Sequence, residues 1–253
     1  MGKSLIARFI AVVAMVAALN VETASAETST LLVVGDSITC GMLSRSQTCG
    51  SNYRGFGNLR ETLLAQGTFT DVIVDAAYSR NVAGIASTKR NGAKTISRYL
   101  QDNEVDAFVV ALGSNDLQHS FRPAFFETSI REVMRLAAGK PVSWVTVYRS
   151  DRNYYPRRAA TFNAVLNRLA TEYPNLTIVD WTTPLVANPA WQAFDKLHLE
   201  PVGYRARIPY FVEAASAAWA KLQPTPTTTT IVGQPTTTTT VVGQPTTTTT
   251  VAP

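Results

Sequence analysis

Three polar blocks of the sequence carry residue types that can break an acyl bond. Gly35-Asp36-Ser37 supplies a hydroxyl, Gly113-Ser114-Asn115-Asp116 an amide, and Asp195-Lys196-Leu197-His198 a carboxylate and an imidazole. A serine hydroxyl becomes a strong nucleophile when a histidine takes its proton, and an aspartate can orient that histidine. An amide N–H can stabilise the oxyanion that forms when serine attacks a carbonyl, and losing such a donor typically costs about 3 kcal/mol. This chemistry requires a fold that brings the blocks together.

Each block also has an ordinary structural interpretation. Gly-Asp-Ser is a common turn sequence, and Asn115 and Asp116 are both suitable caps for a following helix. The chain contains two histidines, His119 and His198, and each lies three residues after an aspartate. Spacing alone therefore leaves both histidines as candidates for the base.

The elements that must position these blocks are visible in the hydrophobic pattern. Strands are predicted at Leu31–Val34, Val72–Ala76, Ala107–Leu112, Val142–Tyr148 and Leu176–Trp181. Helices are predicted at Phe56–Ala65, Thr95–Gln101, Ala124–Ala138, Arg157–Tyr173 and Val202–Leu222. Strand-helix alternation indicates a mostly parallel five-stranded sheet, and the nearly continuous apolar strands indicate helices on both of its faces. We therefore expect an α/β fold, a three-layer α/β/α sandwich whose site lies beyond the carboxyl ends of the strands.

In their order along the chain, the three blocks resemble those of the SGNH, or GDSL-type, serine hydrolase family. That family has Gly-Asp-Ser at the end of its first strand, Gly-x-Asn-Asp after a middle strand and Asp-x-x-His before its last helix. The similarity extends from Leu31 to about Leu222 and includes the segment Leu199–Tyr204. It implies a flavodoxin-like SGNH hydrolase fold and an esterase or lipase activity that needs no metal or organic cofactor.

The resemblance also implies a role for each side chain. Ser37 is then the nucleophile, His198 the general base and Asp195 the carboxylate that orients it. The side chain of Asn115 and the backbone N–H of Ser37 are two oxyanion donors. His119 becomes a wall of the site or a substrate contact.

The chain departs from the family in the loop after the second strand. There the family usually supplies a third oxyanion donor from a backbone N–H, often that of a glycine. The corresponding stretch here is Asp75-Ala76-Ala77-Tyr78-Ser79-Arg80. Ser79 is the expected donor and Gly84 the alternative, and a side chain at this point narrows the approach to the site.

Both ends of the chain differ in composition from the middle. Residues 1–26 have the pattern of a secretory signal peptide, in which the apolar run Phe9–Leu19 is too short to span a bilayer. From Pro224 onward a ten-residue Pro/Thr unit repeats, and it has too little apolar surface to offset the entropy lost on ordering. The sequence predicts a signal peptide (1–26), one hydrolase domain (27–223) and a disordered Thr/Pro-rich tail (224–253).

The two cysteines of the chain, Cys40 and Cys49, lie close together in the sequence. In an exported protein such a pair is more typical of a disulfide than of a metal site, and zinc needs more ligands than these. A disulfide would contribute about 2 to 3 kcal/mol to stability. Two free thiols are the alternative.

The expected function is that of a secreted serine esterase acting on O-acyl esters. Export and the tail favour an extracellular or wall-associated substrate, such as an O-acetylated polysaccharide, over an intracellular thioester; short-chain acyl and lipid esters remain candidates. The formal net charge is +5, but the arginines are scattered, so nucleic acid is not an expected partner. No membrane span is expected after signal removal. The alternatives are an O-acyltransferase that uses the same nucleophile and a non-catalytic wall-binding module.

Overall fold

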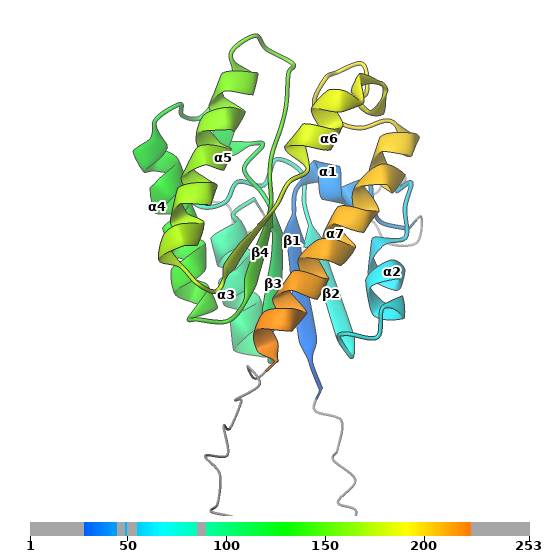
Figure 1. The fold of residues 1–253 in the computed structure, drawn as a ribbon, viewed down its shortest axis with the longest axis vertical. Helices are drawn as coiled ribbons and strands as arrows, with labels where there is room; N and C mark the ends of the chain where they lie inside the picture. The colour runs from blue at the N-terminus through cyan, green and yellow to red at the C-terminus, as the bar shows by residue number, and fades with distance from the viewer. Residues whose placement is uncertain (1–27, 45–48, 50–54, 85–89, 224–253) are drawn as a thin grey trace, which may run out of the picture. The chain divides into compact units, whose positions relative to one another are not determined.

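The computed structural model describes residues 28–44, 49, 55–84 and 90–223 (Figure 1). The predicted signal peptide and repeat tail lie outside these residues, so their structure stays a prediction. No helix in the described ranges combines the length and apolarity that crossing a membrane requires.

The described chain is built around one sheet of five strands that are all parallel to their neighbours. In spatial order they are β2 (Asp71–Ala76), β1 (Thr30–Gly35), β3 (Ala107–Ala111), β4 (Val142–Val145) and β5 (Leu176–Val179). The register places Gly35 of β1 between Ala76 of β2 and Ala111 of β3. Three strands therefore end side by side, which brings the loops after them to one edge of the sheet.

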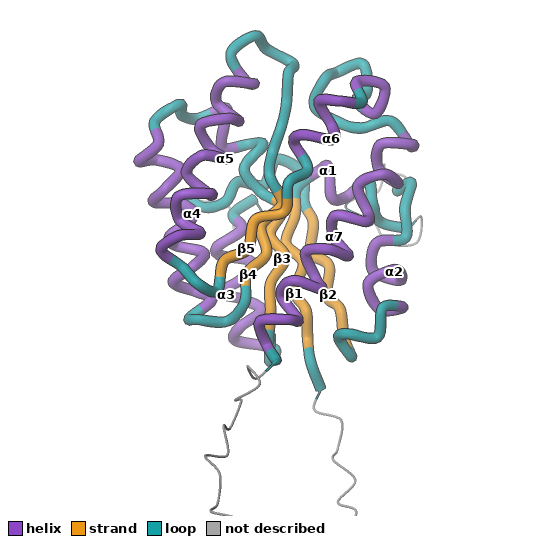
Figure 2. The backbone as a smooth tube through the Cα atoms, viewed as in Figure 1, coloured by secondary structure: helices purple, strands orange, loops and turns teal. Residues whose placement is uncertain are grey.

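Helices cover both faces of this sheet, as Figure 2 shows. They are α1 (Ser37–Cys40), α2 (Leu59–Ala65), α3 (Gly92–Asp102), α4 (Pro123–Ala137), α5 (Tyr155–Glu172), α6 (Thr182–Ala187) and α7 (Pro201–Leu222), with short 3-10 helices η1 (Asp116–Gln118) and η2 (Pro189–Trp191). Apolar side chains of α3, α4 and α5 form one core with the sheet, and those of α2 and α7 form another. The predicted three-layer α/β/α sandwich is confirmed.

Alternation along β1 explains why the strand is apolar throughout. Leu32 and Val34 belong to the core beneath α3, α4 and α5, whereas Leu31 and Val33 belong to the core beneath α2 and α7. Successive side chains of a strand point to opposite faces, so a strand covered on both sides needs apolar residues at every position. The near-continuous apolar run in the sequence reflects this double burial.

Two strands end at least two residues before their predicted ends. β4 stops at Val145 and β5 at Val179, because the side chain of Thr146 takes over as a hydrogen-bond partner beyond them. Its Oγ1 accepts hydrogen bonds from the backbone N–H groups of Trp181 (2.9 Å) and Thr182 (3.0 Å). A side-chain partner thus replaces the strand ladder and lets the chain turn into α6.

Helix α3 begins three residues before its predicted start, at Gly92 instead of Thr95. The side chain of Asn91 accepts a hydrogen bond from the backbone N–H of Lys94 at 3.0 Å, which caps the first turn. The cap extends the helix beyond the segment that shows apolar periodicity.

The short helix α1 packs directly against α7. A Cβ atom on Gly41, the residue that ends α1, would lie 2.1 Å from the ring of Tyr204 in α7. Only glycine fits this close approach. It sets the distance between the segment after β1 and the last helix.

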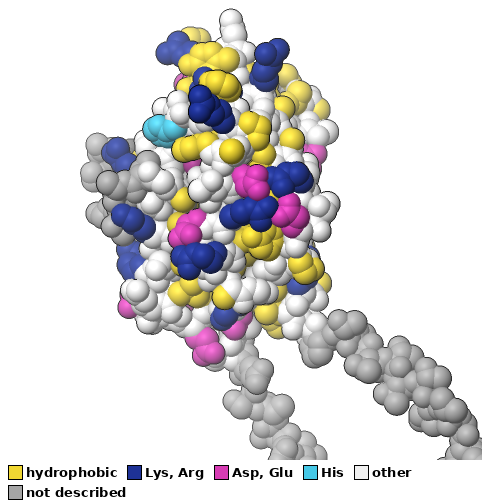
Figure 3. All heavy atoms as spheres, turned by 90° about the vertical axis from the view of Figure 1, so that its left-hand side faces the viewer, with side chains coloured by type: hydrophobic (Ala, Val, Ile, Leu, Met, Phe, Trp, Pro, Cys, Tyr) yellow, Lys and Arg dark blue, Asp and Glu magenta, His cyan; other side chains and the backbone are white. Residues whose placement is uncertain are grey.

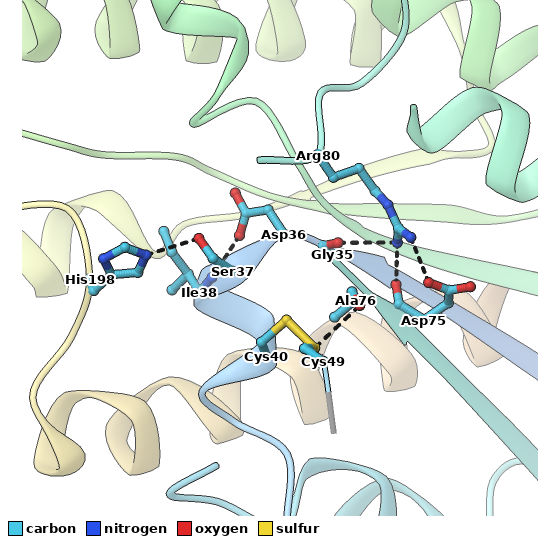
Figure 4. Close-up of a disulfide and its surroundings, with 10 residues drawn as sticks. All are labelled: Gly35, Asp36, Ser37, Ile38, Cys40, Cys49, Asp75, Ala76, Arg80 and His198. Carbon is cyan, nitrogen blue, oxygen red and sulfur yellow. Dashed lines mark hydrogen bonds and ion pairs between the residues drawn. A yellow bond between two sulfur atoms is a disulfide. The ribbon is translucent and has the colours of Figure 1, made fainter. Parts of the chain in front are cut away.

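A disulfide joins Cys40 of α1 to Cys49, as the sequence predicts. Figure 4 shows this bond beside the end of β2, where Cys49 Sγ lies 3.2 Å from the carbonyl oxygen of Ala76. The crosslink therefore joins α1 to Cys49 beside the end of the neighbouring strand.

Asp116 is a fully buried carboxyl that fastens the loop after β2 to the loop after β3. Its two oxygens accept a hydrogen bond from the backbone N–H of Val82, at 3.2 and 3.0 Å. Burial raises the pKa of this carboxyl to about 7. The hydrogen bond from the Val82 N–H lowers the pKa, and the nearby negative charge of Asp36 raises it further. The group is therefore harder to ionise in the folded protein than in the unfolded chain.

We predict that Asp116 makes the protein less stable as pH rises from about 4 to about 7. The ordinary pKa of 3.8 is raised on folding, so the folded state holds a proton that the unfolded state loses across this interval. Between about pH 4 and about pH 7, the unfolding free energy of the wild type should fall by an amount on the order of 4 kcal/mol more than that of Asp116→Asn. Urea unfolding of both proteins between pH 4 and pH 8 measures the difference, with Asp102→Asn, at an exposed position, as control. Curves that run parallel for wild type and Asp116→Asn would contradict the prediction.

Candidate active site

Ser37 lies at the carboxyl end of β1, where the chain turns sharply into α1. Asp36 caps this helix, because its Oδ1 accepts a hydrogen bond from the backbone N–H of Ile38 at 3.0 Å. A Cβ atom on Gly35 would lie 2.2 Å from Oγ1 of Thr39, so the turn has no room for a side chain there. Glycine and the capping aspartate together present the Ser37 hydroxyl at the edge of the sheet.

His198 reaches Ser37 from the loop between η2 and α7. Its Nε2 lies 3.0 Å from Ser37 Oγ, although the two residues are 161 positions apart in the sequence. The close-up in Figure 4 shows the imidazole directed at this hydroxyl. The other ring nitrogen, Nδ1, lies 2.5 Å from Oδ2 of Asp195. Since an ionised carboxylate only accepts hydrogen bonds, Nδ1 carries a proton and Nε2 is free to accept one from Ser37.

The loop around Asp195 fixes this carboxylate as well as the imidazole. Oδ1 of Asp195 accepts hydrogen bonds from the backbone N–H groups of Leu197 (3.0 Å) and His198 (2.9 Å). Partial burial raises the pKa of Asp195, but the hydrogen bonds from the His198 ring and from these two N–H groups outweigh it and leave the pKa below its ordinary value. Asp195 is therefore ionised at neutral pH and can stabilise an imidazolium.

Asn115 lies at the end of the loop after β3, and its side chain reaches Asp36, next to Ser37. Its Nδ2 donates to the carbonyl oxygen of Arg80 at 3.1 Å and makes a longer contact of 3.5 Å with Oδ2 of Asp36. Its Oδ1 accepts from Nε2 of Gln118 at 3.3 Å. The amide is thus oriented by three neighbours, one of which, Asp36, directly precedes Ser37.

The two alternatives for a further backbone donor lie in different places. Ser79 has a left-handed backbone (φ 52°) and lines a cavity of about 330 Å³ together with Asn115 and His119. Gly84 also has positive φ (83°), but it lines a separate hollow formed by α3 and α4. His119 is exposed at the end of η1 and lines the same cavity as Asn115. The imidazole that is hydrogen-bonded to Ser37 belongs to His198, not to His119.

Arg80 is a buried residue that the sequence did not identify. Its Nη1 donates to the carbonyl oxygens of Gly35 (3.2 Å) and Asp75 (2.7 Å), and its Nη2 contacts Oδ1 of Asp75 at 2.6 Å (Figure 4). Its own carbonyl oxygen accepts the hydrogen bond from Asn115. Arg80 therefore ties together the ends of three adjacent strands. Its neighbours in the sequence are typical of a polar surface loop, which gives no sign of this burial.

A second buried arginine, Arg207, lies close enough to Asp36 for its charge to act on that carboxyl. The guanidinium of Arg207 in α7 is 5.5 Å from the ring of Trp181 and 5.4 Å from that of Phe211, and its Nε and Nη1 have no hydrogen-bond partner within the described residues. Burial raises the pKa of Asp36, and the positive charge of Arg207 is the largest influence that opposes the rise. A buried cation thus helps to keep a carboxylate next to Ser37.

Within the described ranges, no three side chains of the histidine, cysteine, aspartate and glutamate types come together as a metal site requires. The polar groups around Ser37 instead form hydrogen-bonded pairs suited to moving a proton and stabilising an oxyanion.

Similar folds occur in solved structures of ester-cleaving enzymes. A lipase/acylhydrolase from Enterococcus faecalis is 19% identical, with 78% of this chain and 99% of that chain aligned at a TM-score of 0.58. TesA is 20% identical, with 77% and 100% aligned at 0.57, and a carbohydrate acetylesterase family member from Sinorhizobium meliloti is 17% identical, with 76% and 100% aligned at 0.54. At these identities the likeness establishes a shared fold. A search of curated protein sequences found no match.

Membership of a family is established by the sequence itself. Residues 33–206 match the model of the GDSL-like lipase/acylhydrolase family, a segment that covers more than half of the chain. The segment includes Ser37 at its start, Asn115 in its middle and His198 near its end. The predicted resemblance is confirmed, and the chain belongs to the GDSL-like lipase/acylhydrolase family of ester-hydrolysing enzymes.

Proposed function

We propose that this protein is an exported serine esterase in which Ser37 is the nucleophile, His198 the general base and Asp195 the residue that orients the base. The observation that carries the proposal is the unbroken series of hydrogen bonds from Ser37 Oγ to His198 Nε2 (3.0 Å) and from His198 Nδ1 to Asp195 (2.5 Å). An alcohol becomes a strong nucleophile when a positioned base takes its proton as it attacks.

The reaction runs in two halves on these groups. Ser37 Oγ attacks the ester carbonyl while its proton passes to His198 Nε2, and His198 then gives that proton to the departing alcohol. Water next attacks the acyl-serine, losing a proton to His198, and the acid leaves as Ser37 regains its proton. Asp195 holds the ring in one tautomer and stabilises the imidazolium that forms twice in each turnover.

Asn115 and two backbone N–H groups, those of Ser37 and Ser79, stabilise the oxyanion in this scheme. The contact between Asn115 Nδ2 and Asp36 is long, at 3.5 Å, so this N–H can turn to an oxyanion without breaking a strong hydrogen bond. The position of Ser79 on the cavity that Asn115 lines favours it over Gly84 as the other loop donor. Arg80 supports both segments, since it bonds the carbonyl of Gly35 and accepts from Asn115.

Small acyl groups on a carbohydrate are the substrate class that we favour. The cavity beside Asn115 is small and lined by polar side chains, which suits a short acyl group better than a long alkyl chain. The Sinorhizobium meliloti structure with this fold is named a carbohydrate acetylesterase. Export is supported by the signal-like pattern of residues 1–26 and by the disulfide, which persists in oxidising compartments. The repeat tail suits a role in attachment to a cell wall.

Removal of either proposed proton-transfer partner should abolish turnover. We expect Ser37→Ala and His198→Ala each to lower kcat on p-nitrophenyl acetate by a factor on the order of 10⁴ to 10⁶. His119→Ala, which removes the second imidazole of the chain, should keep activity within the same order of magnitude. Steady-state kinetics with circular dichroism as a folding check decides the matter. An inactive His119→Ala beside an active His198→Ala would reverse the assignment of the base.

Asn115→Ala tests the oxyanion role separately from nucleophile activation. Because the amide acts on charge that develops only in the transition state, kcat should fall by about 10²- to 10³-fold while KM changes little. Asn103→Ala, on the exposed end of α3, is the matched control and should leave both constants unchanged. A rise in KM at constant kcat would instead make Asn115 a substrate-binding residue.

A further inference from the structure

The charges of α4 and α5 are balanced along most of their length but not where the helices begin. In the second half of α5, Arg168 pairs with Glu127 and Glu172. Arg122, which precedes α4, and Arg158, in the first turn of α5, have no carboxylate within salt-bridge distance in the described part of the chain. In Figure 3, basic and acidic side chains alternate across the middle of this face, whereas basic and hydrophobic ones gather towards its upper end.

A groove of about 660 Å³ lies between these two arginines. We call it the basic groove and define it by His119, Phe121, Arg122 and Arg158. Phe121 is 63% exposed, so one face of its ring is open to solvent. A cation beside an exposed aromatic ring offers a ligand both a charge to pair with and an apolar face to stack on.

Arg158 is held in place before any ligand arrives. Its Nη1 donates to the carbonyl oxygen of Leu117 at 2.6 Å, and its guanidinium carbon lies 4.5 Å from the ring centre of Tyr154 and 5.8 Å from that of Phe121. A guanidinium fixed in this way loses little side-chain entropy when it binds a carboxylate. The groove is therefore organised for an anion.

The basic groove continues into the cavity beside the proposed catalytic residues. Gln118 and His119 line both the groove and the 330 Å³ cavity, where Ser79 and Asn115 also lie. A ligand longer than one sugar ring can thus occupy the groove and the cavity at the same time. The path runs from Arg158 past His119 to the side chain of Asn115.

We propose that the basic groove binds the chain of an acidic polysaccharide, with carboxylates on Arg122 and Arg158 and a sugar ring on Phe121. The proposal rests on the proposed function, because a polymer bound in this path presents its O-acyl ester next to Ser37. Nucleic acid carries the same sign of charge but no O-acyl ester, which is why the polysaccharide is the better occupant. Guanidinium groups bind carboxylates in a two-point geometry, and this gives the groove selectivity for uronic acids over neutral sugars.

Binding can be measured without any ester chemistry. Isothermal titration of the whole protein with hexagalacturonate, at low salt, should show saturable binding that weakens at 0.5 M NaCl, whereas maltohexaose should bind at least about tenfold more weakly. Arg122→Gln, an exposed position, and Arg122→Gln/Arg158→Gln should each lower the affinity for hexagalacturonate, the double variant by about tenfold or more. Arg135→Gln removes an exposed arginine of α4 that pairs with Glu132, and it should bind like the wild type.

Turnover of a polymer and of a small ester separates the groove from the catalytic residues. For each protein we take the ratio of kcat/KM on O-acetylated polygalacturonate to kcat/KM on p-nitrophenyl acetate. This ratio should be at least about tenfold lower in the double variant than in the wild type, mostly because KM for the polymer rises. Arg135→Gln should leave this ratio unchanged. Thermal unfolding of each variant identifies any variant that loses activity only because it no longer folds. If the double variant does not fold, the single variant Arg122→Gln is compared with the wild type instead.

The outcomes distinguish the groove from the esterase assignment. Hydrolysis of the aryl ester without measurable binding of hexagalacturonate would overturn the groove proposal and leave the proposed function standing. Binding of hexagalacturonate by a wild type that hydrolyses no ester would overturn the proposed function instead. Equal affinity for maltohexaose, or single-stranded DNA bound as tightly through the same arginines, would also overturn the choice of an acidic polysaccharide.

Discussion

The hydrogen bond between Ser37 and His198 is the contact on which the proposed chemistry depends, and the parallel sheet makes it possible. The residues are 161 positions apart, and neither belongs to an element that could find the other by local folding. Ser37 stands at the end of the first strand, and His198 comes from a loop that α7 anchors against the same sheet. Because all five strands run in one direction, their loops share one edge, where distant segments can meet.

Buried polar and ionisable side chains connect the loops at this edge. Arg80 links the ends of β1 and β2 to Asn115, and Asp116 bonds Val82 in the loop after β2. The charge of Arg207 acts on the carboxyl of Asp36. Burying an ion is costly, and removing one partner of such a pair leaves the other uncompensated. These contacts therefore couple the position of Asn115 to that of the segment that carries Ser37.

The fold was predictable because its signals are local and repeated. Double burial of β1 and β3 leaves an apolar residue at nearly every position, and the order of the three polar blocks carries the family resemblance. What the sequence did not predict depends on partners far away in the chain. Arg80 and Arg207 are of a residue type that is usually exposed, and only the assembled fold shows which carbonyls and carboxylates surround them. The early ends of β4 and β5 likewise depend on one threonine, Thr146, whose hydroxyl takes the place of a strand partner.

Covalent labelling addresses the proposed relay most directly, because it reports nucleophile activation without a choice of substrate. The protein is treated with a fluorophosphonate, digested and mapped by mass spectrometry. A phosphonyl group on the peptide that contains Ser37, formed rapidly by the wild type and by His119→Ala but at least about a thousandfold more slowly by His198→Ala, is the predicted result. Labelling of Ser37 at the same rate after loss of His198, or labelling confined to another residue, would contradict the assignment.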